Sequence, residues 1–186
     1  MVWYEFLASL GPVFRSFELV IIVFLVTKFW EHRFSLFFGG KNTLKTQDDH
    51  ELHSCFLTAF CTLIFYFIGA RVADAVLNIS MDKIELRRLY YFSFIVHGAI
   101  FIISLYLFHK IRDCNFSNCA KLCAGMVIFS ATFNIIQFIA RGYFDFNYFN
   151  TIYSIGIPLC NLATFIILTI YSIKLALNSR KHRVKS

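Results

Sequence analysis

Charged side chains interrupt otherwise apolar stretches of this sequence at helical spacing. Arg15 and Glu18 are three residues apart, and so are Arg71 and Asp74. Residues three or four apart share one face of a helix, so each pair could form an ion pair there. An acid or base of this kind inside a membrane could instead relay a proton or line a path for ions.

A third polar set lies nearer the C-terminus and consists mainly of amides. Asn134, Gln137 and Arg141 fall at positions i, i+3 and i+7, which predicts a polar stripe on one helix face. Asn161 lies near Pro158, which frees a backbone carbonyl that needs a donor. One interpretation is that the stripes converge on a wet interior. We favour the other, in which the ion pairs neutralise themselves and the amides join helices together.

The histidines offer weaker candidates for metal or haem binding. His97 lies within a predicted span, where it could relay a proton or bind haem, but no second histidine lies at that depth to complete a haem site. We therefore expect a packed, neutral side chain with one hydrogen bond. His50 and His53 are spaced as H-x-x-H rather than as the H-E-x-x-H of zinc hydrolases. A solvated helix N-terminus capped by Asp48 or Asp49 explains them more simply.

The cysteine spacing does not predict a metal site. His109, Cys114, Cys119 and Cys123 surround one predicted turn, but no two of these cysteines form a C-x-x-C pair. The sequence also lacks a P-loop, a dinucleotide-binding glycine pattern and a Ser-His-Asp arrangement. We therefore expect no metal, no other cofactor and no enzymatic activity.

The composition indicates that lipid surrounds most of the chain. Of the 186 residues, 58% are hydrophobic and only 16% are charged. A soluble domain is about 45–50% apolar with roughly a quarter of its residues charged, so one core cannot bury this excess. The sequence thus predicts an all-α, polytopic transmembrane helical bundle. The net charge of +7 comes without any nucleic-acid motif, so we expect contact with anionic headgroups and no nucleic acid.

The apolar stretches predict five membrane spans in a single domain, residues 1–178. About 20 residues cross the hydrocarbon core as a helix. The predicted spans are residues 12–31, 54–78, 89–109, 121–140 and 149–174. The first has a short uncharged centre, so it could instead be a helix on the membrane surface, which would leave four spans. A basic tail, residues 179–186, follows the last span.

The charges of the connections predict the orientation of the chain. Lys and Arg are concentrated in the tail and in the connections at 31–53 and 109–121, which places these segments in the cytoplasm. The N-terminus is then outside. The connection at 80–88 weakens this prediction, because it contains Arg87, Arg88 and a lysine. We expect the bacterial inner membrane as the location.

Two functions fit these features. The first is a self-associating membrane protein with a channel-like or membrane-permeability role. Its support is the polar stripes, the short connections, and the small residues Gly98, Ala99, Ala124 and Gly125, which allow helices to approach closely. The alternative is a non-enzymatic interaction protein, such as an immunity or chaperone-like factor that acts on another membrane protein. A homo-oligomer would favour the first function, and a monomer with one partner the second.

Overall fold

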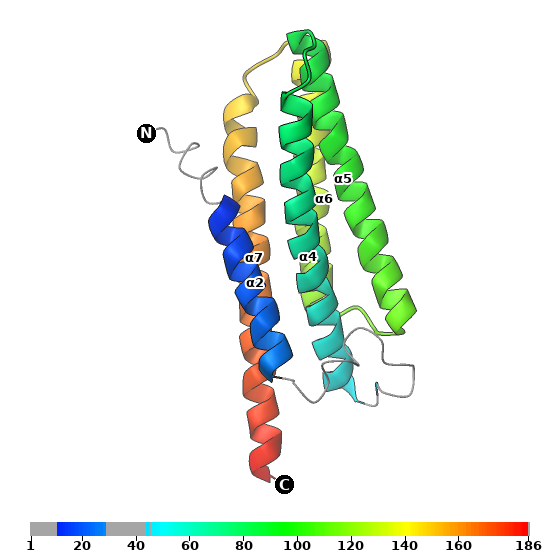
Figure 1. Ribbon diagram of the computed structural model, residues 1–186, viewed down its shortest axis with the longest axis vertical. Coiled ribbons are helices and arrows are strands. Elements are labelled where there is room, and N and C mark those ends of the chain that lie inside the picture. Colours follow the sequence, from blue (N-terminus) through cyan, green and yellow to red (C-terminus); the bar gives the residue numbers. More distant parts are fainter. Residues whose placement is uncertain (1–10, 29–43, 45, 186) are drawn as a thin grey trace.

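The chain folds into helices that lie side by side along one long axis (Figure 1). The computed structural model describes residues 11–28, 44 and 46–185, and these residues contain no β-strand. The helices are α2 (Gly11–Lys28), α4 (Gln47–Leu77), α5 (Lys83–Arg112), α6 (Asn118–Tyr143) and α7 (Asn150–Lys185). The prediction of an all-helical bundle is confirmed.

Four of these helices are long and apolar enough to cross a membrane. Helices α4, α5, α6 and α7 each contain an 18-residue stretch with a mean hydropathy of 1.8 or 1.9. They match the four predicted spans that follow residue 53. The apolar part of α2 is shorter, Ser16–Thr27. At a rise of 1.5 Å per residue, all of α2 is about 27 Å long, slightly less than the hydrocarbon core.

The outer surface of the bundle is apolar, as a lipid-facing surface requires. On α5, large exposed side chains recur every three or four residues and so share one face: Phe92, Val96, Ile100, Ile103 and Leu107. A continuous apolar stripe of this kind is unusual on a soluble monomer, whereas lipid solvates it well. The exposed faces and the helix lengths together indicate a membrane protein.

Helices α4 to α7 form an antiparallel bundle in which chain neighbours pack against each other. Helix α2 packs against α4 and α7 and runs in the same direction as α7 (Figure 1). Leu25 of α2, Phe56 of α4 and Leu168 of α7 are fully buried in the core at this junction. The end of the bundle with the 78–82 and 144–149 connections is called the upper end below.

The opposite, lower end contains the 113–117 connection and the start of α4. The way in which α4 starts corrects one prediction. Neither Asp48 nor Asp49 is the N-cap of α4. Thr46 is the cap: its hydroxyl accepts the Asp49 N–H at 3.1 Å, and the Asp49 carboxylate accepts the Thr46 N–H at 3.0 Å. This capping box satisfies two helix-end donors, so α4 begins at Gln47, seven residues before the predicted span. Hydropathy finds only the apolar part of such a helix.

The last helix also extends beyond its predicted end. Helix α7 continues to Lys185, so the predicted basic tail is a continuation of this helix. The side chains from residue 179 onward lie outside the described part. Pro158 lies within α7.

Candidate functional site

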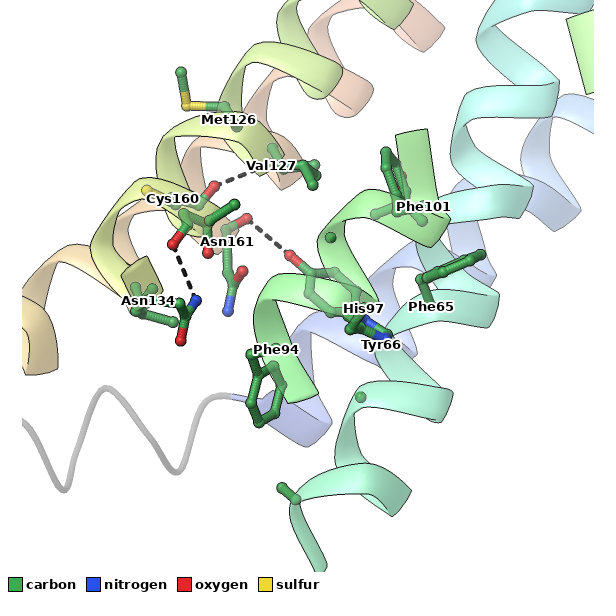
Figure 2. Close-up of a pocket in the computed structure, with 18 of the residues that line it drawn as sticks. Phe65, Tyr66, Phe94, His97, Phe101, Met126, Val127, Asn134, Cys160 and Asn161 are labelled. Carbon is green, nitrogen blue, oxygen red and sulfur yellow. Dashed lines mark hydrogen bonds between the residues drawn. The ribbon is translucent and has the colours of Figure 1, made fainter. Parts of the chain in front are cut away.

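A cavity of about 400 Å³ lies between α4, α5, α6 and α7 (Figure 2). Its walls on α4 come from the C-terminal half of that helix, so the cavity occupies the part of the bundle nearer the upper end. Aromatic rings form much of the wall, among them Phe65, Tyr66, Phe94 and Phe101. The volume falls within the range of about 300–1,000 Å³ that is typical of small-molecule sites.

The polar groups of the cavity wall come from all four helices and include two of the predicted amides. Asn134 of α6 and Asn161 of α7 both line the cavity. Both polar atoms of the Asn134 amide are engaged, because its Oδ1 accepts the Tyr153 hydroxyl at 3.0 Å and its Nδ2 donates to the Ser130 carbonyl at 3.0 Å. Asn134 therefore joins α6 to α7, as the helix-joining interpretation predicted for an amide of this stripe.

Asn161 differs from Asn134 because its side-chain amide has no hydrogen-bond partner among the described residues. Only its backbone carbonyl is engaged, as the acceptor of the Tyr66 hydroxyl at 3.4 Å. The predicted role of this side chain, a donor to the carbonyl freed by Pro158, is not found. The Asn161 amide is thus one donor group and one acceptor available to a molecule in the cavity.

His97 forms part of the cavity wall on α5. Its ring centroid lies 5.1 Å from that of Phe65 and 6.0 Å from that of Phe94. Gly69 on α4 makes room for the ring, because a Cβ at that position would lie 3.3 Å from His97 Nε2. His97 can therefore contribute a flat, weakly polar surface to a bound molecule.

Comparisons with known protein families, with curated proteins and with solved structures gave no match for this chain. The site must be interpreted from its own chemistry. The described residues of its lining provide aromatic rings, hydroxyls and amides, and none of them is Asp, Glu, Lys or Arg. The site is therefore suited to an uncharged molecule, because a charged one would lose its hydration without meeting an opposite charge.

The rest of the predicted α6 stripe continues from the cavity toward the upper end. Arg141 Nη1 donates to the Tyr91 hydroxyl at 3.1 Å and to Asn150 Oδ1 at 2.6 Å. Arg141 Nε and both polar atoms of the Gln137 amide are buried without hydrogen-bond partners. The stripe thus faces the bundle interior, which is what the wet-interior interpretation requires.

Arg71 and Asp74 lie outside this site. Both side chains are exposed near the upper end of α4, and no ion pair joins them. The backbone carbonyl of Asp74 accepts hydrogen bonds from Asn78 at the helix end. For this pair the wet-interior interpretation is therefore wrong, and so is the favoured interpretation, in which the pair neutralises itself.

Glu18 lies at the junction of α2 with the bundle and not in the cavity wall. The side chain is 0% exposed, and neither carboxyl oxygen has a hydrogen-bond partner. Arg15 is three residues earlier on α2, but its side chain lies outside the described part. The prediction that this pair neutralises itself therefore does not hold for Glu18. The described group with which Glu18 interacts electrostatically is Tyr66 of the cavity wall.

A second polar cluster, at the lower end, joins residues that are far apart in sequence. The Ser54 hydroxyl lies 2.8 Å from His109 Nε2 and 2.9 Å from Ser117 Oγ, and it accepts the Ser117 N–H at 2.9 Å. His109 Nδ1 bonds the Leu105 carbonyl at 2.8 Å. The pair resembles a nucleophile and its base. However, a backbone carbonyl replaces the third, acidic group, and both side chains are buried, so we interpret the cluster as a joint between helices.

The H-x-x-H pair belongs to the same end of the bundle, and the expectation of a solvated helix start is wrong for half of it. His53 is buried, and its Nδ1 accepts the Arg112 Nε–H at 3.3 Å. His50 is partly exposed, and its Nδ1 accepts the Asn115 N–H at 3.3 Å. His53 therefore joins α4 to the end of α5, and His50 joins α4 to the 113–117 connection.

The cysteines near the lower end are buried free thiols. Cys55 Sγ lies 3.8 Å from Cys119 Sγ, and Cys119 in turn interacts with Cys123. Among the residues that the structure describes, no three His, Cys, Asp or Glu side chains form a group suited to a metal ion. Cys114 lies in the 113–117 connection, where burial raises the pKa of its thiol to about 11 although Arg112 opposes the shift.

Proposed function

We propose that this protein is an integral membrane protein that binds a small uncharged solute in the cavity between α4, α5, α6 and α7 and lets it cross the membrane. The observation that carries the proposal is the unpaired Asn161 amide in a wall of aromatic rings and hydroxyls. Such a wall, mostly apolar with a few hydrogen-bonding groups, is typical of small-molecule sites. This proposal is a specific form of the membrane-permeability role predicted from the sequence.

The proposed path lies within one chain and not between several. Gly98, one of the small residues that suggested self-association, packs inside the chain: a Cβ there would lie 3.6 Å from Ala131 Cβ and 3.7 Å from Val127 Cγ1. The close approach that this glycine permits therefore joins α5 to α6. Self-association stays a separate prediction, tested by native mass measurement of the detergent-solubilised protein expressed alone.

We propose further that the upper end faces outward, with the N-terminus outside and the C-terminus in the cytoplasm of a bacterium. The basic residues of the 80–88 connection opposed this orientation. Arg87 forms an ion pair with Asp145, and Arg88 donates to the Gly142 carbonyl at 2.6 Å and lies over the Tyr143 ring. Because both arginines are engaged within the chain, they weigh less against an external location than free basic residues do.

Filling the cavity tests the proposal. Ala73 lines the cavity, whereas Ala75, two residues later on α4, is exposed. The same substitution can therefore be made inside and outside, as Ala73→Phe and Ala75→Phe. The protein is reconstituted in liposomes. Entry of urea and glycerol is followed by the shrinkage and reswelling of the liposomes, and entry of indole by its fluorescence.

We expect faster entry of at least one of these solutes than into protein-free liposomes. Ala73→Phe should reduce this entry at least tenfold, and Ala75→Phe should leave it within about twofold of the wild-type rate. Asn161→Leu should reduce the entry of hydrogen-bonding solutes, with Asn118→Leu on the exposed start of α6 as its control. Equal rates for the two phenylalanine variants, or no entry above protein-free liposomes, would reject the proposal.

A further inference from the structure

The inward face of α2 contains a carboxyl group where its neighbours are apolar. Glu18, Ile21 and Leu25 are spaced as i, i+3 and i+7, and all three are buried against the bundle. Phe17 and Val20 on the other side of the helix are exposed. The acid is therefore directed into the junction between α2, α4 and α7 and not toward an aqueous surface.

Among the residues that the structure describes, none stabilises a negative charge on Glu18. Both carboxyl oxygens are buried without a hydrogen-bond donor. No described basic side chain interacts with the carboxyl group, and the loss of hydration on burial is the effect that acts on it. An ionised carboxylate in such a place loses its hydration without compensation, so the group holds its proton.

Among the described residues, the titratable groups that interact with Glu18, or with its neighbour Tyr66, are hydroxyls and thiols. Helix α4 contributes the Tyr66 hydroxyl, which interacts electrostatically with Glu18. Around Tyr66 lie the thiols of Cys123 from α6 and Cys160 from α7. A change of charge on proton binding at this junction therefore occurs at Glu18, and Tyr66 is the first described group that it affects.

Tyr66 connects the buried acid to the cavity. Its ring lines the cavity, and its hydroxyl donates to the Asn161 backbone carbonyl at 3.4 Å (Figure 2). The charge of an ionised Glu18 would act on the Tyr66 hydroxyl, weaken its bond to this carbonyl and so disturb the wall that presents the Asn161 amide. A protonated Glu18 leaves the wall as it is.

We propose that Glu18 is a proton-binding site of the bundle interior and that its protonation is coupled, through Tyr66, to solute binding in the cavity. The coupling rests on the proposed function, whereas the proton site does not. The protonated state favours the binding-competent wall. Solute entry is therefore fastest when Glu18 carries its proton, and it slows as pH rises far enough to remove that proton.

The proton site is tested by labelling with dicyclohexylcarbodiimide, which reacts with protonated carboxyls in apolar surroundings. The carboxyl adds across one C=N bond and the adduct rearranges to a stable acylurea, so the whole reagent mass is retained. After reaction in lipid nanodiscs, peptide mass mapping should find the adduct on Glu18 and not on the exposed Asp74. Glu18→Gln removes the adduct. Labelling of Asp74 as strongly as Glu18, or no label on Glu18, overturns the proton site.

The coupling is tested by solute entry between pH 6 and pH 10 with the urea, glycerol and indole assays. Wild-type entry should fall at least fivefold toward high pH. Glu18→Gln, which imitates the protonated acid, should keep the low-pH rate throughout, and Tyr66→Phe should lose the pH dependence while Glu18 is still labelled. Entry that is independent of pH in the wild type overturns the coupling but leaves the proposed function intact. No entry at any pH rejects the proposed function and the coupling with it, while the labelling still decides the proton site.

Discussion

The lower-end joint around Ser54 offers a stability prediction whose size follows from the structure. Ser54→Ala removes one hydroxyl that bonds His109 Nε2 at 2.8 Å, Ser117 Oγ at 2.9 Å and the Ser117 N–H at 2.9 Å. Each buried polar group left without a partner costs about 1–3 kcal/mol. The His109 nitrogen and the Ser117 N–H are the two groups left without their partner, so we expect a loss of about 2–6 kcal/mol of unfolding free energy.

Thermal unfolding in detergent, followed by circular dichroism, measures this loss. For a chain of this size, about 1 kcal/mol shifts the midpoint by roughly 2–4 °C, so the midpoint should fall by several degrees. Ser80→Ala is the matched control, because Ser80 is exposed in the connection between α4 and α5. A Ser54→Ala midpoint that agrees with that of Ser80→Ala would refute the assignment of this cluster as a joint that holds three segments together.

Three further predictions concern single positions. Gly156→Ala should be less stable than Gly125→Ala by roughly 1–3 kcal/mol in the same unfolding assay. The new Cβ at position 156 would lie 2.8 Å from the Phe133 ring, whereas the space at Gly125 is open. Equal stabilities of the two variants would contradict this prediction. Arg141→Leu should lower the free energy of unfolding by about 1–3 kcal/mol, because two hydrogen bonds are lost. Arg71→Leu on the exposed face should change stability little. A larger loss for Arg71→Leu than for Arg141→Leu would be inconsistent with the site. Burial raises the pKa of Cys114 from 9.0 to about 11, so the folded chain keeps a proton there that the unfolded chain releases, and stability should fall as pH rises from about 9 to 11. Iodoacetamide should alkylate this thiol about 100-fold more slowly at pH 8 in the folded than in the unfolded chain, and equal rates would show that the thiol is not buried.

The helices and their apolar character could be predicted from the sequence, because hydropathy and helical period are properties of consecutive residues. The four long apolar helices after residue 46 are of this kind, and so is the placement of Asn134, Gln137 and Arg141 on one face. The helix ends were predicted less well. Thr46 begins α4 through a capping box that lies in a polar stretch, and polar residues give no hydropathy signal.

Only the tertiary structure decided which polar side chains meet. Tyr66 and Asn161 are 95 residues apart, and Ser54 and His109 are 55 apart, so no local pattern links them. In the sequence, Arg71 and Glu18 were equally plausible as polar groups of the bundle interior, since each lies three residues from an opposite charge. The packing of the helices left Arg71 exposed and buried Glu18 without a hydrogen-bond partner. The direction in which a helix face points depends on contacts between distant segments, and the spacing of residues along one helix does not contain that information.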